Sequence, residues 1–219
     1  MAYLISDRCD LCGICIDQCP AKAINTGENE VIINSISCNG CGRCIPICPK
    51  EALDLKNTTD QQIIAQIKGI VEGESKTPKI IAFVQKRTAY DSVDLGGQIR
   101  RNYSPEIRII RVPGIARLGS KHVLHAFAAG ADGAVFVEGD DSISNRDRLR
   151  DRVLLFKKDL RKFGINPLRL QPVITTLPQY EKTLNLFDIV VERIKKMTPI
   201  NQEKRNEIKK HLEVEEIVS

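Results

Sequence analysis

The stretch CDLCGICIDQCP at residues 9–20 returns as CNGCGRCIPICP at residues 38–49. Each cysteine of the second run follows its counterpart by 29 residues. The flanking residues correspond as well, since PAKAI at 20–24 matches PKEAL at 49–53. Between the two runs, EVIIN at 30–34 follows a turn signal and predicts a short strand. The beginning of the chain is therefore a repeated unit, and we expect two halves related by a pseudo-two-fold axis.

The spacing Cys-x-x-Cys-x-x-Cys-x-x-x-Cys-Pro is typical of bacterial-type ferredoxins with two 4Fe-4S clusters, in which the fourth cysteine of each run ligates the other cluster. Gly13, Gly40 and Gly42 give the backbone the freedom to curl around a cluster. Zinc is the alternative, but it usually takes two separated Cys-x-x-Cys pairs. The predicted ligands are Cys9, Cys12, Cys15 and Cys48 for cluster 1, and Cys38, Cys41, Cys44 and Cys19 for cluster 2.

All eight cysteines lie within the first 48 residues. A disulfide scaffold would need a secretory route, and the start MAYLISDRCD has neither the basic region nor the apolar core of a signal peptide. No apolar run reaches the ~18 residues of a membrane helix. Metal ligation in a cytoplasmic protein is the expectation that follows.

The net charge of +5 is not accompanied by the aromatic residues that stack on bases, because aromatics make up 5% of the chain and tryptophan is absent. Basic residues are dense at 100–117 and 146–169. We interpret them as docking faces for acidic protein partners, with an ordinary solvated helix face as the alternative. No nucleic-acid partner is predicted.

The rest of the chain alternates strand and helix, which predicts an α/β fold with a small, three-layer, flavodoxin-like parallel sheet. Strands are expected at 79–84, 107–112, 133–137 and 168–173, and helices at 60–71, 92–102, 120–129, 146–163 and 178–197. The expected organisation is a dicluster ferredoxin domain (1–56), a connecting helix and linker (57–78), the α/β domain (79–198) and an amphipathic tail (199–219). The tail could bind a partner or be a solvated end.

The α/β domain contains, in this order, KIIAF at 79–83, IRIIRVP at 107–113, GADG at 130–133 and RVLL at 152–155. Together these segments resemble the delta (iron–sulfur) subunit of the methyl-viologen-reducing hydrogenases found alongside heterodisulfide reductase. In that family, cysteines at the carboxyl ends of the first three strands bind a 2Fe-2S cluster. Here the positions that correspond hold Gln85, Thr88, Gly114, Asp140 and Asn145. The second domain is therefore expected to contain no iron.

The vacated sheet edge has an alternative use, since the carboxyl ends of parallel strands are where such sheets bind ligands. An anionic small molecule could bind near Arg87, Arg117, Arg146 and Arg148. His122 and His125 could be read as a metal-binding pair, but no third ligand is spaced to complete a site. We find no nucleophile with a base and no nucleotide fingerprint, so the chain has no predicted active site of its own.

The resemblance implies an electron-transfer component of an anaerobic redox complex with several subunits, related to heterodisulfide reductase and hydrogenase and of the kind used in methanogenesis. Its expected partners are flavoprotein, hydrogenase, heterodisulfide reductase-like or other metalloenzyme subunits, in a hetero-oligomer. The alternative is a non-catalytic assembly or reductive-activation factor of a metalloenzyme. A freely diffusing ferredoxin is a third possibility, but it would assign no function to more than half of the chain.

Overall fold

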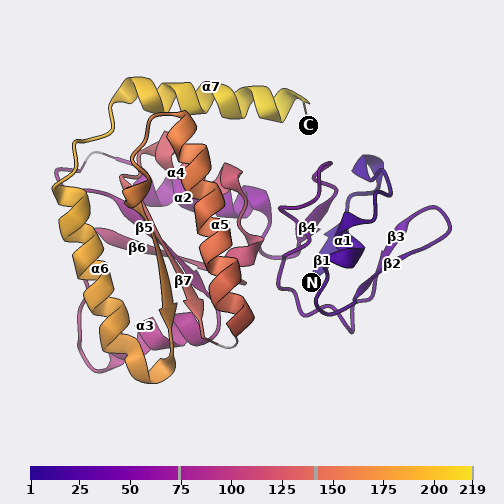
Figure 1. Ribbon diagram of the computed structural model, residues 1–219, viewed down its shortest axis with the longest axis horizontal. Coiled ribbons are helices and arrows are strands. Elements are labelled where there is room, and N and C mark those ends of the chain that lie inside the picture. The colour runs from indigo at the N-terminus through magenta and orange to yellow at the C-terminus, as the bar shows by residue number, and fades with distance from the viewer. Residues whose placement is uncertain (74, 141–142, 219) are drawn as a thin grey trace.

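The computed structural model describes residues 1–73, 75–140 and 143–218. A small N-terminal module with short strands lies beside a larger part in which helices enclose a sheet (Figure 1). The first part holds all of the cysteines, and the second begins with helix α2.

The N-terminal module pairs strands between its two halves. A shift of 29 residues converts β1 (Ala2–Leu4) into β3 (Val31–Ile33), and β2 (Ile24–Thr26) into β4 (Leu53–Leu55). Strand β1 pairs antiparallel with β4, and β2 with β3. Each small sheet therefore contains one strand from each half. Of these strands, the sequence predicted only β3.

The backbone of the two halves repeats as closely as the sequence does. Gly13 and Gly42 both adopt positive φ, at 76° and 72°, and so do Lys22 and Glu51, at 47° each. The N–H of Cys12 donates to the side chain of the residue two before it, and the N–H of Cys41 does the same, at 3.2 and 3.1 Å. Both cysteine runs therefore form the same loop, and the glycines stand where a left-handed conformation is needed.

The larger part contains a four-stranded parallel sheet in the order β6-β5-β7-β8. The strands are β5 (Ile80–Gln85), β6 (Ile107–Val112), β7 (Gly133–Gly139) and β8 (Leu170–Thr175). Both central strands are buried along their whole length, as expected when helices cover the two faces of a parallel sheet. The parallel sheet and the α/β class are confirmed.

Helices cover the two faces of the sheet (Figure 1). One face packs against α2 (Asp60–Val71), α4 (Ser120–Ala129) and α5 (Ile143–Lys162), and the other against α3 (Thr88–Gln98) and α6 (Tyr180–Lys195). Helix α7 (Gln202–Val218) packs on α4. The short helices are α1 (Ile14–Asp17) and the 3-10 turns η1 (Ser6–Arg8), η2 (Ile115–Arg117), η3 (Pro167–Arg169) and η4 (Leu177–Gln179).

The helices predicted at 92–102 and 146–163 and the strand predicted at 168–173 differ in their bounds from α3, α5 and β8. Helix α3 runs from Thr88 to Gln98 and so follows β5 almost directly, and in its first turn the N–H of Ala89 donates to the side chain of Gln85. Strand β8 begins at Leu170 rather than at residue 168. The cause is η3, in which the side chain of Asn166 accepts the N–H of Leu168 at 2.9 Å.

Helix α2 and the C-terminal helix both belong to the core of the α/β part. Ile63 and Ile67 of α2 are fully buried in the cluster that covers the sheet, as is Ile208 of α7. Arg205 of α7 donates to the carbonyl oxygens of Phe127 and Ala131, at 2.6 and 2.9 Å. The tail is therefore not a solvated end, because its apolar face packs on α4.

Candidate metal centres

Two separate cavities in the N-terminal module are lined by cysteines. Each takes three cysteines from one run and the last cysteine of the other run. The first cavity is lined by Cys9, Cys12, Cys15 and Cys48, and the second by Cys19, Cys38, Cys41 and Cys44. The crossing of the two runs follows from the strand pairing, because each sheet joins one half of the module to the other.

The thiols in each cavity lie close enough to influence one another. Burial raises the pKa of the Cys15 thiol, and the nearby thiols of its cavity add to the effect. Burial raises the pKa of Cys44 to about 12, with further contributions from Cys41, from Cys15 of the first cavity and from Cys19. Protonated thiols in such sites give up their protons to a bound cation, since the thiolate is the metal ligand.

The fourth cysteine of each run receives a hydrogen bond from the backbone. The N–H of Ala23 donates to Sγ of Cys19, and the N–H of Ala52 donates to Sγ of Cys48, both at 3.3 Å. Backbone donors aimed at cysteine sulfur are one means by which a protein tunes an iron–sulfur cluster. Four thiols around a cavity, one of them with a backbone donor to its sulfur, suit a 4Fe-4S cluster.

The two histidines that sequence reasoning considered as a pair do not form a metal site. Nδ1 of His122 accepts the N–H of Gly119 at 3.1 Å, and its Nε2 lies 3.0 Å from Oδ1 of Asp60. Within residues 1–73, 75–140 and 143–218, no three His, Cys, Asp or Glu side chains gather around a single-ion position.

Arg117 joins the α/β part to the second cysteine run, residues 38–49, which we call the cluster 2 loop. This fully buried side chain places its guanidinium 2.8 Å from the carboxylate of Asp54 and 2.6 Å from that of Asp60. Its stem lies against Gly42, where an added Cβ would come within 2.4 Å of Arg117 Cδ. The sequence analysis considered Arg117 as one of the residues that could bind a small anion. That assignment is wrong, because the Arg117 guanidinium is already paired with the carboxylates of Asp54 and Asp60.

Further charged groups surround Asp60 at this junction. Nζ of Lys121 lies 2.6 Å from Glu51 and also contacts Asp60. Burial opposes ionisation of Asp60, but His122, Arg117 and Lys121 outweigh it and hold the pKa of this carboxyl well below its usual range. The same carboxylates keep the pKa of Lys121 raised despite its burial. The junction is thus a buried ionic network, and no sequence pattern pointed to it.

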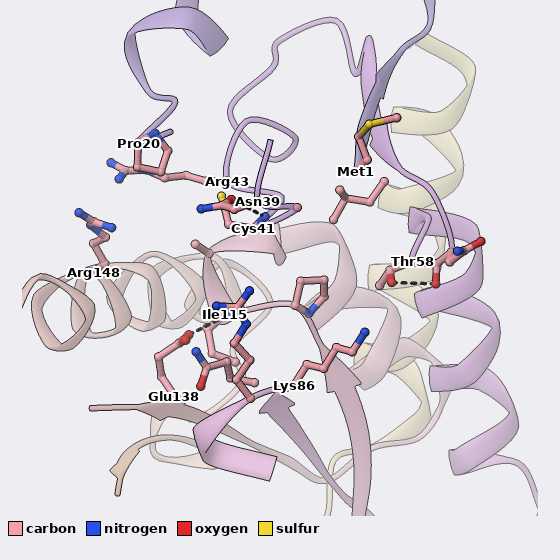
Figure 2. Close-up of a pocket in the computed structure, with 18 of the residues that line it drawn as sticks. Met1, Pro20, Asn39, Cys41, Arg43, Thr58, Lys86, Ile115, Glu138 and Arg148 are labelled. Atoms are coloured by element: carbon pink, nitrogen blue, oxygen red, sulfur yellow. Dashed lines mark hydrogen bonds between the residues drawn. The ribbon is translucent and has the colours of Figure 1, made fainter. Parts of the chain in front are cut away.

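A larger cavity of about 890 Å³ lies between the cluster 2 loop and the carboxyl edge of the sheet (Figure 2). Of the five positions expected at the vacated cluster site, Gln85 and Gly114 line it, and so do Arg87 and Arg148 of the alternative anion site. Thr88 lies at the start of α3, and Asp140 follows β7. The side chains of Asn145 and Arg146 fall outside the described residues.

Comparison with known families places both parts of the chain. Residues 1–68 match the model of a 4Fe-4S dicluster domain, which makes this an iron–sulfur protein. Residues 80–198 match the model described as methyl-viologen-reducing hydrogenase, delta subunit. Because that match covers more than half of the chain, the protein belongs to the hydrogenase delta-subunit family.

Three curated relatives match the chain over different shares of its length. The chain is 32% identical over 94% of its length to a subunit of the ferredoxin:CoB-CoM heterodisulfide reductase of Methanosarcina mazei, and 33% identical over 94% to a subunit of the ferredoxin/F(420)H(2)-dependent CoB-CoM heterodisulfide reductase of Methanosarcina acetivorans. It spans 26% of each of these proteins. It is also 32% identical to an iron-sulfur subunit of the F420-non-reducing hydrogenase vhu of Methanopyrus kandleri, over 58% of this chain and 98% of that protein.

None of the described helices is both long and apolar enough to cross a lipid bilayer.

Proposed function

We propose that this chain is an electron-transfer subunit that holds two 4Fe-4S clusters and relays single electrons within a larger redox complex. The observation that carries the proposal is that each of two cavities is lined by four cysteines, in the crossed combination that the spacing predicts. When bound, such clusters accept and release one electron at a time.

The proposed ligands are the cysteines that line each cavity: Cys9, Cys12, Cys15 and Cys48 for cluster 1, and Cys19, Cys38, Cys41 and Cys44 for cluster 2. Cys15 and Cys44 are buried, whereas Cys12 is exposed. The exposed Cys12 is the point at which we propose that cluster 1 meets a partner.

The role we assign to the α/β part is docking. Its strand order, second-first-third-fourth, with helices on both faces, supports a flavodoxin-like description. Gln85 and Gly114 occupy the carboxyl edge where the family has cluster ligands, so we propose that this part holds no iron. The ionic network around Arg117 would then hold the ferredoxin-type module at a fixed orientation for partner subunits.

The relatives' names suggest which partners to look for, namely heterodisulfide reductase and hydrogenase subunits. The test is anaerobic affinity purification of the chain from its native cells, followed by cross-linking and mass spectrometry. Recovery of a flavoprotein, hydrogenase or heterodisulfide reductase component, cross-linked to the chain, is the expected result. Recovery of metalloenzyme maturation factors alone would instead favour an assembly role.

A second measurement tests electron transfer directly. Dithionite-reduced protein should return electrons to an oxidised acceptor at a rate that collapses when Cys15 or Cys44 is replaced by serine. Equal rates for these variants and for the unaltered chain would contradict the proposal.

A further inference from the structure

We propose that the cavity between the cluster 2 loop and the sheet edge binds a small phosphorylated anion. Its volume of about 890 Å³ is within the range of small-molecule sites, which is roughly 300–1,000 Å³. Residues from both parts of the chain line it, among them Arg43 from the cluster 2 loop, Lys86 after β5 and Arg148 from α5, which are labelled in Figure 2.

The cavity lies where the topology of the sheet favours a ligand. Strand β5 is in the middle of the sheet, the chain passes from it to β6 on one side, and it later runs from β7 to β8 on the other side. Ligands of open α/β sheets bind outside the carboxyl ends of strands at such a reversal. Gln85 ends β5, Glu138 lies near the end of β7, and both line this cavity.

The lining carries an excess of positive charge. Two acidic side chains, Asp91 and Glu138, face five basic ones: Arg43, Lys56, Lys86, Arg87 and Arg148. The carboxylate of Glu138 is buried and accepts the N–H of Ile115 at 2.7 Å, so a backbone donor already compensates part of its charge. A concave site with three more cations than anions attracts anionic ligands.

Two features favour phosphate among the anions. Three of the basic side chains are arginines, whose planar fork matches phosphate oxygens bidentately. Arg87 is also the N-cap of α3, an eleven-residue helix, so the positive end of that helix borders the cavity. The site would therefore hold phosphate groups near α3, with room left for an organic part.

Calorimetric titration of the full-length, cluster-loaded chain under anaerobic conditions tests this site. The probe is pyrophosphate, followed by flavin mononucleotide to measure what an organic part adds. We expect saturable binding of one pyrophosphate per chain. Pyrophosphate binding at this cavity does not require electron transfer. Failure to bind pyrophosphate would therefore leave the proposed electron-transfer function unaffected, and successful binding would not support that function.

The matched variants are Arg148→Gln and Arg150→Gln, which change exposed arginines on the same helix, of which only Arg148 lines the cavity. Loss of one charge-assisted contact should weaken pyrophosphate binding about 10-fold or more in Arg148→Gln, and less than about 2-fold in Arg150→Gln. Arg87→Gln should match Arg148→Gln. Equal weakening by Arg150→Gln, or no saturation at about 10 mM pyrophosphate, overturns the proposal.

Discussion

Gly13 and Gly42 occupy the same position in the two cysteine runs, and replacing each by alanine should cost very different amounts of stability. Both glycines have positive φ, at 76° and 72°, so alanine should pay a similar backbone cost at both sites, about 1–2 kcal/mol. A Cβ on Gly13 meets nothing within 4 Å. A Cβ on Gly42 would lie 2.4 Å from Cδ of Arg117 and 2.8 Å from Cδ1 of Leu55.

Arg117 cannot easily move away, because it is fully buried and its guanidinium is held by Asp54 and Asp60. Overpacking of this kind costs about 1–3 kcal/mol beyond the backbone cost. For a chain of this size, each kcal/mol shifts the melting temperature by roughly 2–4 °C. Gly42→Ala should therefore melt about 2–12 °C below Gly13→Ala.

The assay is circular dichroism of cluster-loaded, anaerobic protein, with both variants heated at one scan rate because loss of clusters makes unfolding irreversible. Equal melting temperatures, or a lower one for Gly13→Ala, would refute the packing of Arg117 on the cluster 2 loop.

Three further predictions concern the junction and the ligands. Arg117→Met removes the buried partner of Asp54 and Asp60 and should lower the free energy of unfolding by about 3 kcal/mol. The control Arg150→Met, on the surface, should change the melting temperature little. An equal decrease in melting temperature for both variants would count against the ionic network. Burial lowers the pKa of His122, so below pH about 6.5 the unfolded chain binds a proton that the folded chain excludes. The free energy of unfolding should then decrease as the pH is lowered, by up to about 1.4 kcal/mol per pH unit. In His122→Gln, melting temperatures measured over the same pH range should lack this decrease. Cys48→Ser and Cys9→Ser should alter the EPR signal of the same cluster in the reduced protein, whereas Cys38→Ser should alter the signal of the other cluster. If Cys48→Ser altered the same signal as Cys38→Ser, crossed ligation would be excluded.

The cysteine cavities could be foreseen because cluster chemistry imposes a spacing that the sequence displays directly. The bounds of β6, α2 and α4 were predicted as well, since each is an apolar or amphipathic run with a clear end. Strands β1, β2 and β4 were not, because three residues are too few to show an alternating pattern.

The junction around Arg117 could not be predicted, since its partners Asp54 and Asp60 lie about sixty residues away and each reads as an ordinary polar residue. The position of α7 was equally hidden. Its buried contacts come from Arg205, Ile208 and Leu212 in an otherwise charged helix, and only the folded core shows what they pack against. Long-range pairing of single charges leaves no local signal in one sequence.

Determination of iron, acid-labile sulfide and zinc per chain in anaerobically purified protein tests the central claim most directly. Two 4Fe-4S clusters held by the eight cysteines, with none in the α/β part, predict eight irons and eight sulfides per chain and no zinc. About ten irons would place a further 2Fe-2S cluster in the chain, and zinc with few irons would contradict the cluster assignment altogether.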